Sequence, residues 1–210
     1  MSKPRIVVVG GGAGGLPLVT KLGAKLGKYG NADITLVDSS NIHVWKPRFH
    51  EVATGAIDAD LDAVDYRAHA QLNHYRFEPG TLTQVDTAGQ TLTLAPLHDA
   101  HGSEVLPERK LSYDYLVLAT GSQSNDFGTP GVRDNCLFMD SRAQAERFRE
   151  RFLNACLHAN HESKPVSVAI VGGGATGVEL AAELHHAVSM LNFYGHEHLD
   201  RKHLQVDIIE

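Results

Sequence analysis

The chain has 210 residues, which is enough for one large domain or two small ones. Hydrophobic residues make up 42% of the sequence and charged residues 21%, a composition that is typical of a folded globular protein and excludes a disordered tail. The formal net charge of −6 provides no basic field for phosphate backbones, so we do not expect nucleic acid as a partner.

The first predicted elements are a strand, a glycine turn and a helix. Ile6–Val9 is a short β-branched run, and apolar residues recur at helical spacing between Leu18 and Leu26 after the glycines. Ile34–Val37 is the next apolar run, and it ends at Asp38. This order predicts two strands of a parallel sheet connected by a helix.

The next elements favour an antiparallel ribbon inserted into this α/β unit. The segments TLTQV (81–85) and TLTLA (91–95) alternate in polarity and flank DTAGQ, which predicts a hairpin. LSYDYLVLATGS, residues 111–122, is interpreted as one buried strand that runs into a glycine turn.

A long helix and a second strand, turn and helix follow. Ser141 and Gln144 have the spacing of a capping box, and apolar residues three or four apart place Cys156 in the core of the helix that follows. Val166–Val171 is predicted to be a fourth buried strand. A helix from about residue 176 to 194 ends at a glycine, and residues 206–209 begin one more strand.

The two glycine turns repeat one motif, GxGxxG. Its glycines are Gly10, Gly12 and Gly15 in the first copy, and Gly172, Gly174 and Gly177 in the second. The first glycine permits a tight turn, the second lets a pyrophosphate approach the backbone, and the third lets the helix pack on the strand. The helix N-terminus then favours the phosphates.

An acid closes the second strand of each unit. Asp38 and Glu210 are suited to hydrogen-bonding a ribose 2′-hydroxyl, although the longer spacing makes Glu210 the weaker assignment. Two dinucleotide sites on one chain predict two redox cofactors, a flavin and a nicotinamide, between which a hydride passes.

Several longer segments carry a family resemblance over essentially the whole chain. They are IVVVGGGAGGL, HVWKPRFHEVATG, YDYLVLATGS and VAIVGGGATGVELAAELHHAV. The sequence resembles the two-dinucleotide-binding flavoprotein reductases and, within them, the type II NADH:quinone oxidoreductases, which are single-subunit NADH dehydrogenases that do not pump protons. The resemblance implies a truncated Rossmann-like α/β fold. Residues 1–120 would be an incomplete FAD-binding domain that lacks its C-terminal segment, and residues 121–210 the first part of an NADH-binding domain.

The resemblance also implies which residues bind the cofactors. The residues expected at FAD are Gly10, Gly12, Ala13, Gly14, Gly15, Asp38, Leu82, Ala119, Thr120 and Gly121. The residues expected at NADH are Gly172, Gly174, Ala175, Thr176, Gly177 and Glu210.

Two residues are expected to be catalytic, and each also has an ordinary structural interpretation. Lys46 would stabilise the negative charge of reduced flavin, or it is a solvated surface lysine. Glu179 would lie close to the nicotinamide and the flavin, or it complements the helix dipole from the first turn of its helix. His50 and Glu51 lie within HVWKPRFHEVATG and are further candidates for a redox site.

The resemblance implies that the parent enzyme uses NADH and a quinone as substrates and attaches peripherally to the cytoplasmic face of the inner membrane through a C-terminal region absent from this chain. No apolar run is as long as a membrane span and no leader peptide is visible, so we expect a cytoplasmic, soluble fragment of about half an enzyme. We expect it to bind FAD weakly, to have no NADH:quinone activity and to self-associate.

The cysteines and histidines limit the alternatives. Cys136 and Cys156 form no CxxC pair, and the histidines have no zinc-site spacing, so no metal site is predicted. A dithiol reductase needs a cysteine pair near the flavin, and residues 41–55 contain no cysteine, so this alternative is disfavoured. A sulfide:quinone reductase is also disfavoured, because it would need Cys156 outside the predicted helix core. Another flavoprotein pyridine-nucleotide reductase of the same fold and a non-catalytic nucleotide-binding module remain as alternatives.

Overall fold

The computed structural model describes residues 2–162 and 164–210, which form two compact units. The first unit comprises the residues up to His43 together with Ala63–Ser122, and the second comprises Val44–Asp62 and Gln123–Glu210. The change of unit at Ser122 lies close to the boundary expected at residue 120. However, Val44–Asp62, expected in the first domain, belongs to the second unit.

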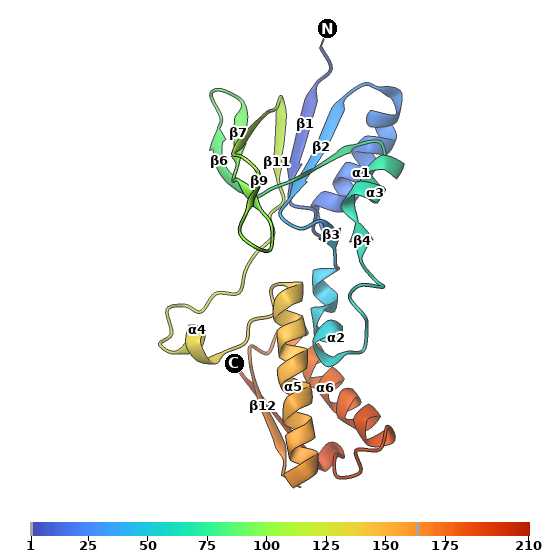
Figure 1. Cartoon of the computed structure of the whole chain (residues 1–210), viewed down its shortest axis with the longest axis vertical. Helices are drawn as coiled ribbons and strands as arrows, with labels where there is room; N and C mark the ends of the chain where they lie inside the picture. The colour runs from blue at the N-terminus through green and yellow to red at the C-terminus, as the bar shows by residue number, and fades with distance from the viewer. Residues whose placement is uncertain (1, 163) are drawn as a thin grey trace. The chain divides into compact units, whose positions relative to one another are not determined.

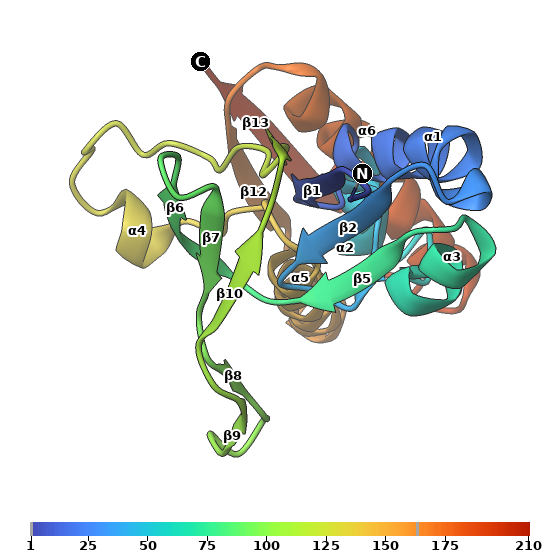
Figure 2. The ribbon, with the colours of Figure 1, turned by 90° about the horizontal axis from the view of Figure 1, so that it is seen from above.

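The first unit is built on a parallel sheet with the strand order β11-β1-β2-β5. Helices lie on one side of this sheet and an antiparallel ribbon on the other (Figures 1 and 2). The sheet strands are β1 (Arg5–Val9), β2 (Asp33–Asp38), β5 (Arg76–Pro79) and β11 (Tyr115–Leu118). The helices are α1 (Gly15–Lys25), the short η1 (Gly27–Tyr29) and α3 (Tyr66–Leu72). The ribbon strands are β6 (Leu82–Asp86), β7 (Thr91–Leu94) and β10 (Arg109–Ser112), and the shorter strands of this unit are β3 (Ile42–His43), β4 (Val64–Asp65), β8 (Leu97–His98) and β9 (Glu104–Leu106).

Both faces of the parallel sheet are buried. On the helical face, Val8, Ile34 and Leu36 pack with Val19 of α1 and Ala70 of α3. The opposite face is covered by the ribbon, and its core residues are Val7, Val9, Val37, Leu92, Leu94 and Tyr113. The near-continuous apolar runs of β1 and β2 are explained by this burial on two sides. The predicted inserted ribbon is confirmed.

The interpretation of residues 111–122 as one strand is wrong. The Tyr113 amide donates to the Gln90 carbonyl on the ribbon side, whereas the next amide, Asp114, donates to the Arg5 carbonyl of the parallel sheet, each at 2.9 Å. The chain therefore changes sheets between these two residues. Within the described residues, β11 is an edge strand, and Tyr115 and Leu118 are exposed.

The second unit packs helices against a parallel pair of strands, β12 (Val166–Val171) and β13 (Leu204–Ile209). Its helices are η2 (Lys46–Arg48), α2 (Phe49–Thr54), α4 (Val132–Asn135), α5 (Arg142–Glu162), α6 (Ala175–Phe193) and η3 (Arg201–His203). One core joins α2, α5, α6 and both strands, and it includes Val52, Phe152, Cys156, Ile170 and Leu184. The segment 44–62 is therefore part of this unit because α2 supplies core side chains.

The start of α5 confirms the predicted capping box. The Gln144 amide donates to Ser141 Oγ at 3.3 Å, and the Ser141 amide donates to Gln144 Oε1 at 3.1 Å. These bonds satisfy two amides at the helix N-terminus that no helical carbonyl reaches. Cys156 is buried in the helix core as predicted.

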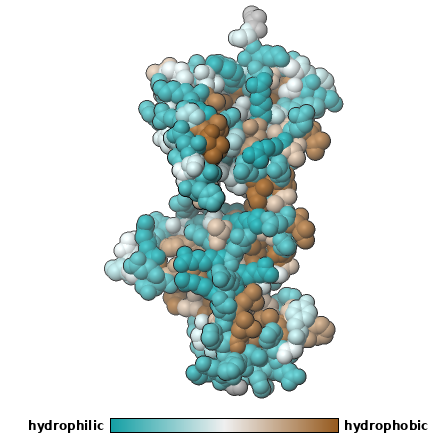
Figure 3. All heavy atoms as spheres, in the orientation of Figure 1, coloured by the Kyte–Doolittle hydropathy of each residue, from teal (hydrophilic) through white to brown (hydrophobic). Residues whose placement is uncertain are grey.

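The predicted burial of β12 is only partly correct. Val166 and Ile170 are buried, but Val171 is 75% exposed. Within the part of the chain that the structure describes, β12 pairs with β13 alone, so its other edge has no strand partner. Figure 3 shows a mostly hydrophilic surface interrupted by hydrophobic patches. Among the described helices, none has the length and apolar character needed to span a membrane.

Candidate dinucleotide-binding sites

The first glycine turn closes tightly between β1 and α1. Gly10 adopts φ +100°, and its amide donates to the Val37 carbonyl at 2.7 Å. A Cβ added to Gly15 would lie 1.7 Å from the Gly10 carbonyl oxygen, so only glycine lets α1 approach the turn this closely. A Cβ on Gly12 would meet no atom within 4 Å, which leaves the backbone accessible to a ligand.

The second turn, between β12 and α6, repeats this geometry. Gly172 has φ +112°, and its amide donates to the Ile209 carbonyl at 2.8 Å. A Cβ on Gly177 would lie 2.2 Å from the Gly172 carbonyl oxygen, while one on Gly174 would meet nothing within 4 Å. The two motifs thus share the tight first glycine, the open second glycine and the helix-packing third glycine.

The two acids also take equivalent positions. Asp38 is the last residue of β2, and its Oδ2 accepts a hydrogen bond from the Gly11 amide at 2.7 Å. Glu210 directly follows β13, and its Oε2 would lie 2.2 Å from a Cβ added to Gly173. Each carboxylate therefore lies beside the middle glycine of its GGG run. The long loop before β13 does not displace Glu210 from this position.

The sequence analysis missed Tyr66, which contacts the carbonyl group of Gly11, whereas Asp38 contacts its amide. Its hydroxyl donates to the Gly11 carbonyl oxygen at 2.7 Å and lies 3.4 Å from His43 Nδ1. Burial raises the pKa of Tyr66 and, by the same cause, lowers the pKa of His43. The sequence feature that could have indicated a close neighbour here is Gly11, a glycine that the GxGxxG motif does not require. A Cβ on Gly11 would overlap the Tyr66 ring, 2.3 Å from its hydroxyl oxygen.

Of the other residues expected at FAD, Ala119 contacts the first turn directly, and the remaining ones follow it in sequence or lie at the end of a neighbouring strand. The Ala119 amide donates to the Val9 carbonyl at 2.7 Å, and the Ala119 carbonyl oxygen would lie 2.3 Å from a Cβ on Gly10. Thr120 and Gly121 continue from this contact, and Gly121 has φ +73°. Leu82 begins β6, three residues beyond Pro79, which pairs with Asp38 at the same edge of the sheet.

The remaining motif residues lie where each helix begins. Ala13 and Gly14 immediately precede α1, and Gly14 is its N-cap residue. Ala175 and Thr176 are the first two residues of α6. The free N–H groups of both helix N-termini thus adjoin the open glycines, which is the arrangement that binds phosphates.

Lys46, one of the two expected catalytic residues, forms an ion pair. Its Nζ donates to Asp140 Oδ1 at 3.0 Å. Burial raises the pKa of Asp140, but hydrogen bonds from Ser124 and Lys46 outweigh it and leave this pKa below its ordinary value. Lys46 is therefore not simply a solvated lysine.

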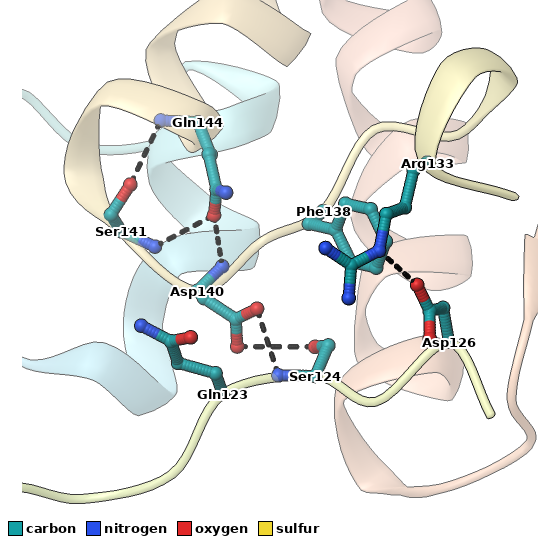
Figure 4. A pocket seen from close by; sticks show the side chains of 8 residues that line it. All are labelled: Gln123, Ser124, Asp126, Arg133, Phe138, Asp140, Ser141 and Gln144. Carbon is teal, nitrogen blue, oxygen red and sulfur yellow. Dashed lines mark hydrogen bonds and ion pairs between the residues drawn. The ribbon is translucent and has the colours of Figure 1, made fainter. Parts of the chain in front are cut away.

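Asp140 also lines a depression of about 420 Å³ in the second unit (Figure 4). The Ser124 amide and hydroxyl donate to its carboxylate at 2.9 and 3.1 Å, and Arg133 is paired with Asp126 across the depression. Arg133 thus compensates the charge of Asp126, and Lys46, which is not part of the lining, compensates that of Asp140. Gln123, Phe138, Ser141 and Gln144 complete the lining.

Glu179, the other expected catalytic residue, is not in the first turn of its helix. The helix α6 begins at Ala175, so Glu179 is its fifth residue, and the interpretation as a first-turn dipole complement is wrong. Its side chain is 53% exposed, and Oε2 lies 3.6 Å from Nδ1 of His50 on α2. The structure therefore brings together two candidates that are far apart in the sequence.

Glu51 is already engaged on the surface of α2. Arg48 Nε donates to both Glu51 oxygens at 3.0 and 3.1 Å, and Arg48 Nη2 donates to Oε2 at 2.7 Å. These hydrogen bonds hold the pKa of Glu51 below its ordinary value. The Glu51 carboxylate is thus compensated by Arg48.

The described residues contain no group of three or more His, Cys, Asp or Glu side chains that could hold a metal ion. Both cysteines are free, with Cys136 exposed and Cys156 buried. Burial raises the pKa of Cys156 to about 11, which suppresses the thiolate that redox chemistry needs.

Two strand, glycine-turn and helix units, each closed by an acid, define a protein with two dinucleotide-binding sites. A family model described as pyridine nucleotide-disulphide oxidoreductase matches residues 4–210, and the chain belongs to this family. The predicted fold class is thereby confirmed.

Relatives and solved structures agree with this family. The chain is 43% identical over 98% of its length, and 50% of the relative's, to a type II NADH:quinone oxidoreductase of Haemophilus influenzae. It is 31% identical over 86% of its length to the external alternative NAD(P)H-ubiquinone oxidoreductase B1, mitochondrial, of Arabidopsis thaliana, and covers 32% of that protein. The structure of NDH2 from Plasmodium falciparum in complex with NADH matches the whole chain with a TM-score of 0.79 and 24% identity, over 42% of its own length. The chain thus spans half or less of the length of these proteins, and the structural match shows the fold.

Proposed function

We propose that this chain supplies the two dinucleotide-binding units of an FAD-dependent NADH:quinone oxidoreductase of type II. The observation that carries the proposal is the duplicated turn: Gly12 and Gly174 are both open to a ligand, each beside a helix N-terminus and an acid. The 43% identity to the Haemophilus influenzae enzyme supports this reaction over others of the family.

The first unit would hold FAD and the second NADH. In the first unit, the amides around Gly10–Gly15 would bind the FAD pyrophosphate, and Asp38 would bind its ribose. Leu82 would lie beside the adenine, and Ala119–Gly121 would lie toward the flavin. In the second, the turn Gly172–Gly177 would bind the NADH pyrophosphate and Glu210 its ribose. The fit rests on the open space at the second glycine of each motif, which a side chain there would fill.

When bound, FAD supplies an acceptor for the hydride of NADH and a donor for the two-electron reduction of a quinone. The chain's own residues would bind and orient the two nucleotides. Lys46 and Glu179 would supply charges at the reacting rings, with Lys46 tuned by its ion pair with Asp140. Attachment of the parent protein to the cytoplasmic face of a membrane, and self-association of this chain, belong to the same proposal.

Anaerobic spectroscopy of the complete oxidoreductase tests the proposal. NADH should bleach a bound flavin, and a quinone added afterwards should restore its colour. A bound flavin that NADH does not bleach would refute the proposed reaction, and a protein without flavin would favour the nucleotide-binding module.

Glu210 provides a separate test of the second site. Glu210→Arg should weaken the binding of NADH and improve the use of NADPH, because a carboxylate repels the NADPH 2′-phosphate whereas a guanidinium pairs with it. We expect the ratio of kcat/KM for the two nucleotides to change by at least about tenfold, because this factor corresponds to the free energy of one charge-assisted hydrogen bond. Asp207→Arg, at an exposed position on the same strand, is the control. An unchanged ratio in Glu210→Arg would remove Glu210 from the site.

A further inference from the structure

The side chain of His50 has a buried nitrogen that lacks a hydrogen-bond partner. His50 is only 9% exposed, and its Nδ1 has no partner among the described residues. A buried polar atom without a partner costs about 1–3 kcal/mol, so such atoms are rare and call for an explanation.

Two carboxylates face the imidazole, one at each ring nitrogen. Nε2 lies 3.9 Å from Glu51 Oε1, and Nδ1 lies 3.6 Å from Glu179 Oε2. Glu51 is held by three hydrogen bonds from Arg48 and is not free to turn toward the ring. The carboxylate of Glu179 is more than half exposed, so a small side-chain rotation can shorten 3.6 Å to a hydrogen bond.

The position of His50 is fixed by the second unit itself. The helix α2 contributes Phe49, Val52 and Ala53 to the core that also contains Leu180 and Leu184 of α6. His50 is thus held by its own helix against the N-terminal half of α6. Glu179 lies on that half, two residues after Gly177, the last glycine of the second turn.

We propose that His50 is a positioning residue for Glu179, whose carboxylate accepts a hydrogen bond from His50 Nδ1 when NADH occupies the turn Gly172–Gly177. This inference rests on the proposed function, because it assigns NADH to the second turn. An exposed glutamate loses side-chain entropy when it is held in one position, and a fixed donor on the protein supplies the compensating contact. The held carboxylate then stabilises the positive charge that the nicotinamide ring gains as it loses hydride.

Substitution can distinguish the roles of the two ring nitrogens of His50. His50→Asn places an amide N–H donor near the position of Nδ1, whereas His50→Gln places it near the position of Nε2. Single-turnover bleaching of flavin by saturating NADH is measured in the complete oxidoreductase. We expect His50→Gln and Glu179→Gln each to slow it at least about tenfold, the value of one charge-assisted hydrogen bond, and His50→Asn to recover most of the loss.

Two further variants sharpen the comparison. The double variant His50→Gln/Glu179→Gln should be no slower than either single variant, because both remove the same contact. Glu183→Gln removes a carboxylate one turn further along α6 and should leave the rate unchanged. Equal losses in His50→Asn and His50→Gln, or additive losses in the double variant, would overturn the proposal.

A spectroscopic measurement does not depend on turnover. In ¹⁵N-labelled protein, adding NAD⁺ should shift the Nδ1 signal of His50 in the wild type and not in Glu179→Gln. If His50 responds identically in both proteins, the proposal is wrong even where NADH bleaches the flavin. If the wild-type flavin is not bleached, the proposed function fails, and the NAD⁺ response of His50 still decides this contact.

Discussion

At the scale of single residues, the third glycine of each motif is fixed by the space that its helix needs. A Cβ on Gly15 would lie 1.7 Å from a backbone oxygen that cannot move without opening the turn. We therefore expect Gly15→Ala to lower the free energy of unfolding by at least about 3 kcal/mol, the upper range for overpacking.

Urea unfolding followed by circular dichroism checks this expectation. Gly14→Ala is the matched control, because a Cβ on Gly14 meets no atom within 4 Å and its φ of −92° suits any residue. The control should change stability by less than about 0.5 kcal/mol, as surface substitutions do. Equal effects at the two positions would mean that α1 does not approach the turn as closely as described.

Tyr66 gives a second prediction at this scale. Tyr66→Phe removes the hydroxyl that donates to the Gly11 carbonyl and should cost about 1–3 kcal/mol of stability. Because Gly11 lies between two glycines of the turn, FAD binding should weaken as well. Fluorescence titration with FAD measures this effect.

Tyr75→Phe is the control for a lost tyrosine hydroxyl in the same core. Its hydroxyl lies 2.8 Å from Nδ1 of His69 on α3, and Tyr75 shares a core cluster with Tyr66. The control should lose stability while keeping its FAD affinity. A parallel loss of affinity in both variants would show that Tyr66 acts through stability alone.

The sequence predicted the residues whose role is local and missed those whose role depends on packing. The roles of Gly10, Gly12 and Gly15 follow from spacing, because each acts within one turn. Tyr66 acts on Gly11 across 55 residues of chain, and no periodicity in the sequence relates the two. The placement of Glu179 in a first turn failed because the end of a helix cannot be located to within a residue from sequence alone.

At the scale of elements, α5 carries a thiol whose ionisation is coupled to folding. Burial raises the pKa of Cys156 from 9.0 to about 11, so the folded chain favours the neutral thiol more strongly than the unfolded chain does. The stability gained from this preference is complete below pH 9.0 and is lost as pH rises through about 11.

The measurement compares urea unfolding of the wild type and Cys156→Ala at several pH values. The stability advantage of the wild type should shrink between pH 9 and pH 11, whereas Cys136→Ala, at an exposed position, should show no such trend. An advantage that stays constant up to pH 11 would contradict the burial of this thiol.

Element prediction succeeded where a pattern is carried by neighbouring residues. The capping box of Ser141 and Gln144 and the apolar spacing of α5 are such patterns. The prediction failed for residues 111–122, because Tyr113 and Asp114 are both compatible with a continuous strand. Only their amide partners, Gln90 and Arg5, show that the chain changes sheets there.

At the scale of the whole molecule, the course of the chain between the two units differs from a simple division at residue 120. The strands β3 and β4 pair within the first unit, so the excursion Val44–Asp62 starts and ends at one place. The sequence analysis predicted no helix in this segment, and nothing in its local pattern indicates that α2 shares a core with α5 and α6. The assignment of the units to FAD and NADH remains a prediction.

The contribution of α2 to the second unit can be tested in the intact chain. Val52 is 1% exposed and shares its core with Cys156, which lies 104 positions later in the sequence. Val52→Asp buries an unpaired charge in that core, and the cost of several kcal/mol should open the second unit. Cys156 should then react with a thiol reagent at neutral pH, in a Cys136→Ser background that leaves it as the single cysteine. Leu61→Asp, at an 85% exposed position of the same excursion, should leave Cys156 protected. If Cys156 stays protected in Val52→Asp as well, α2 is not part of the core of the second unit, and His50 loses the support that holds it near Glu179.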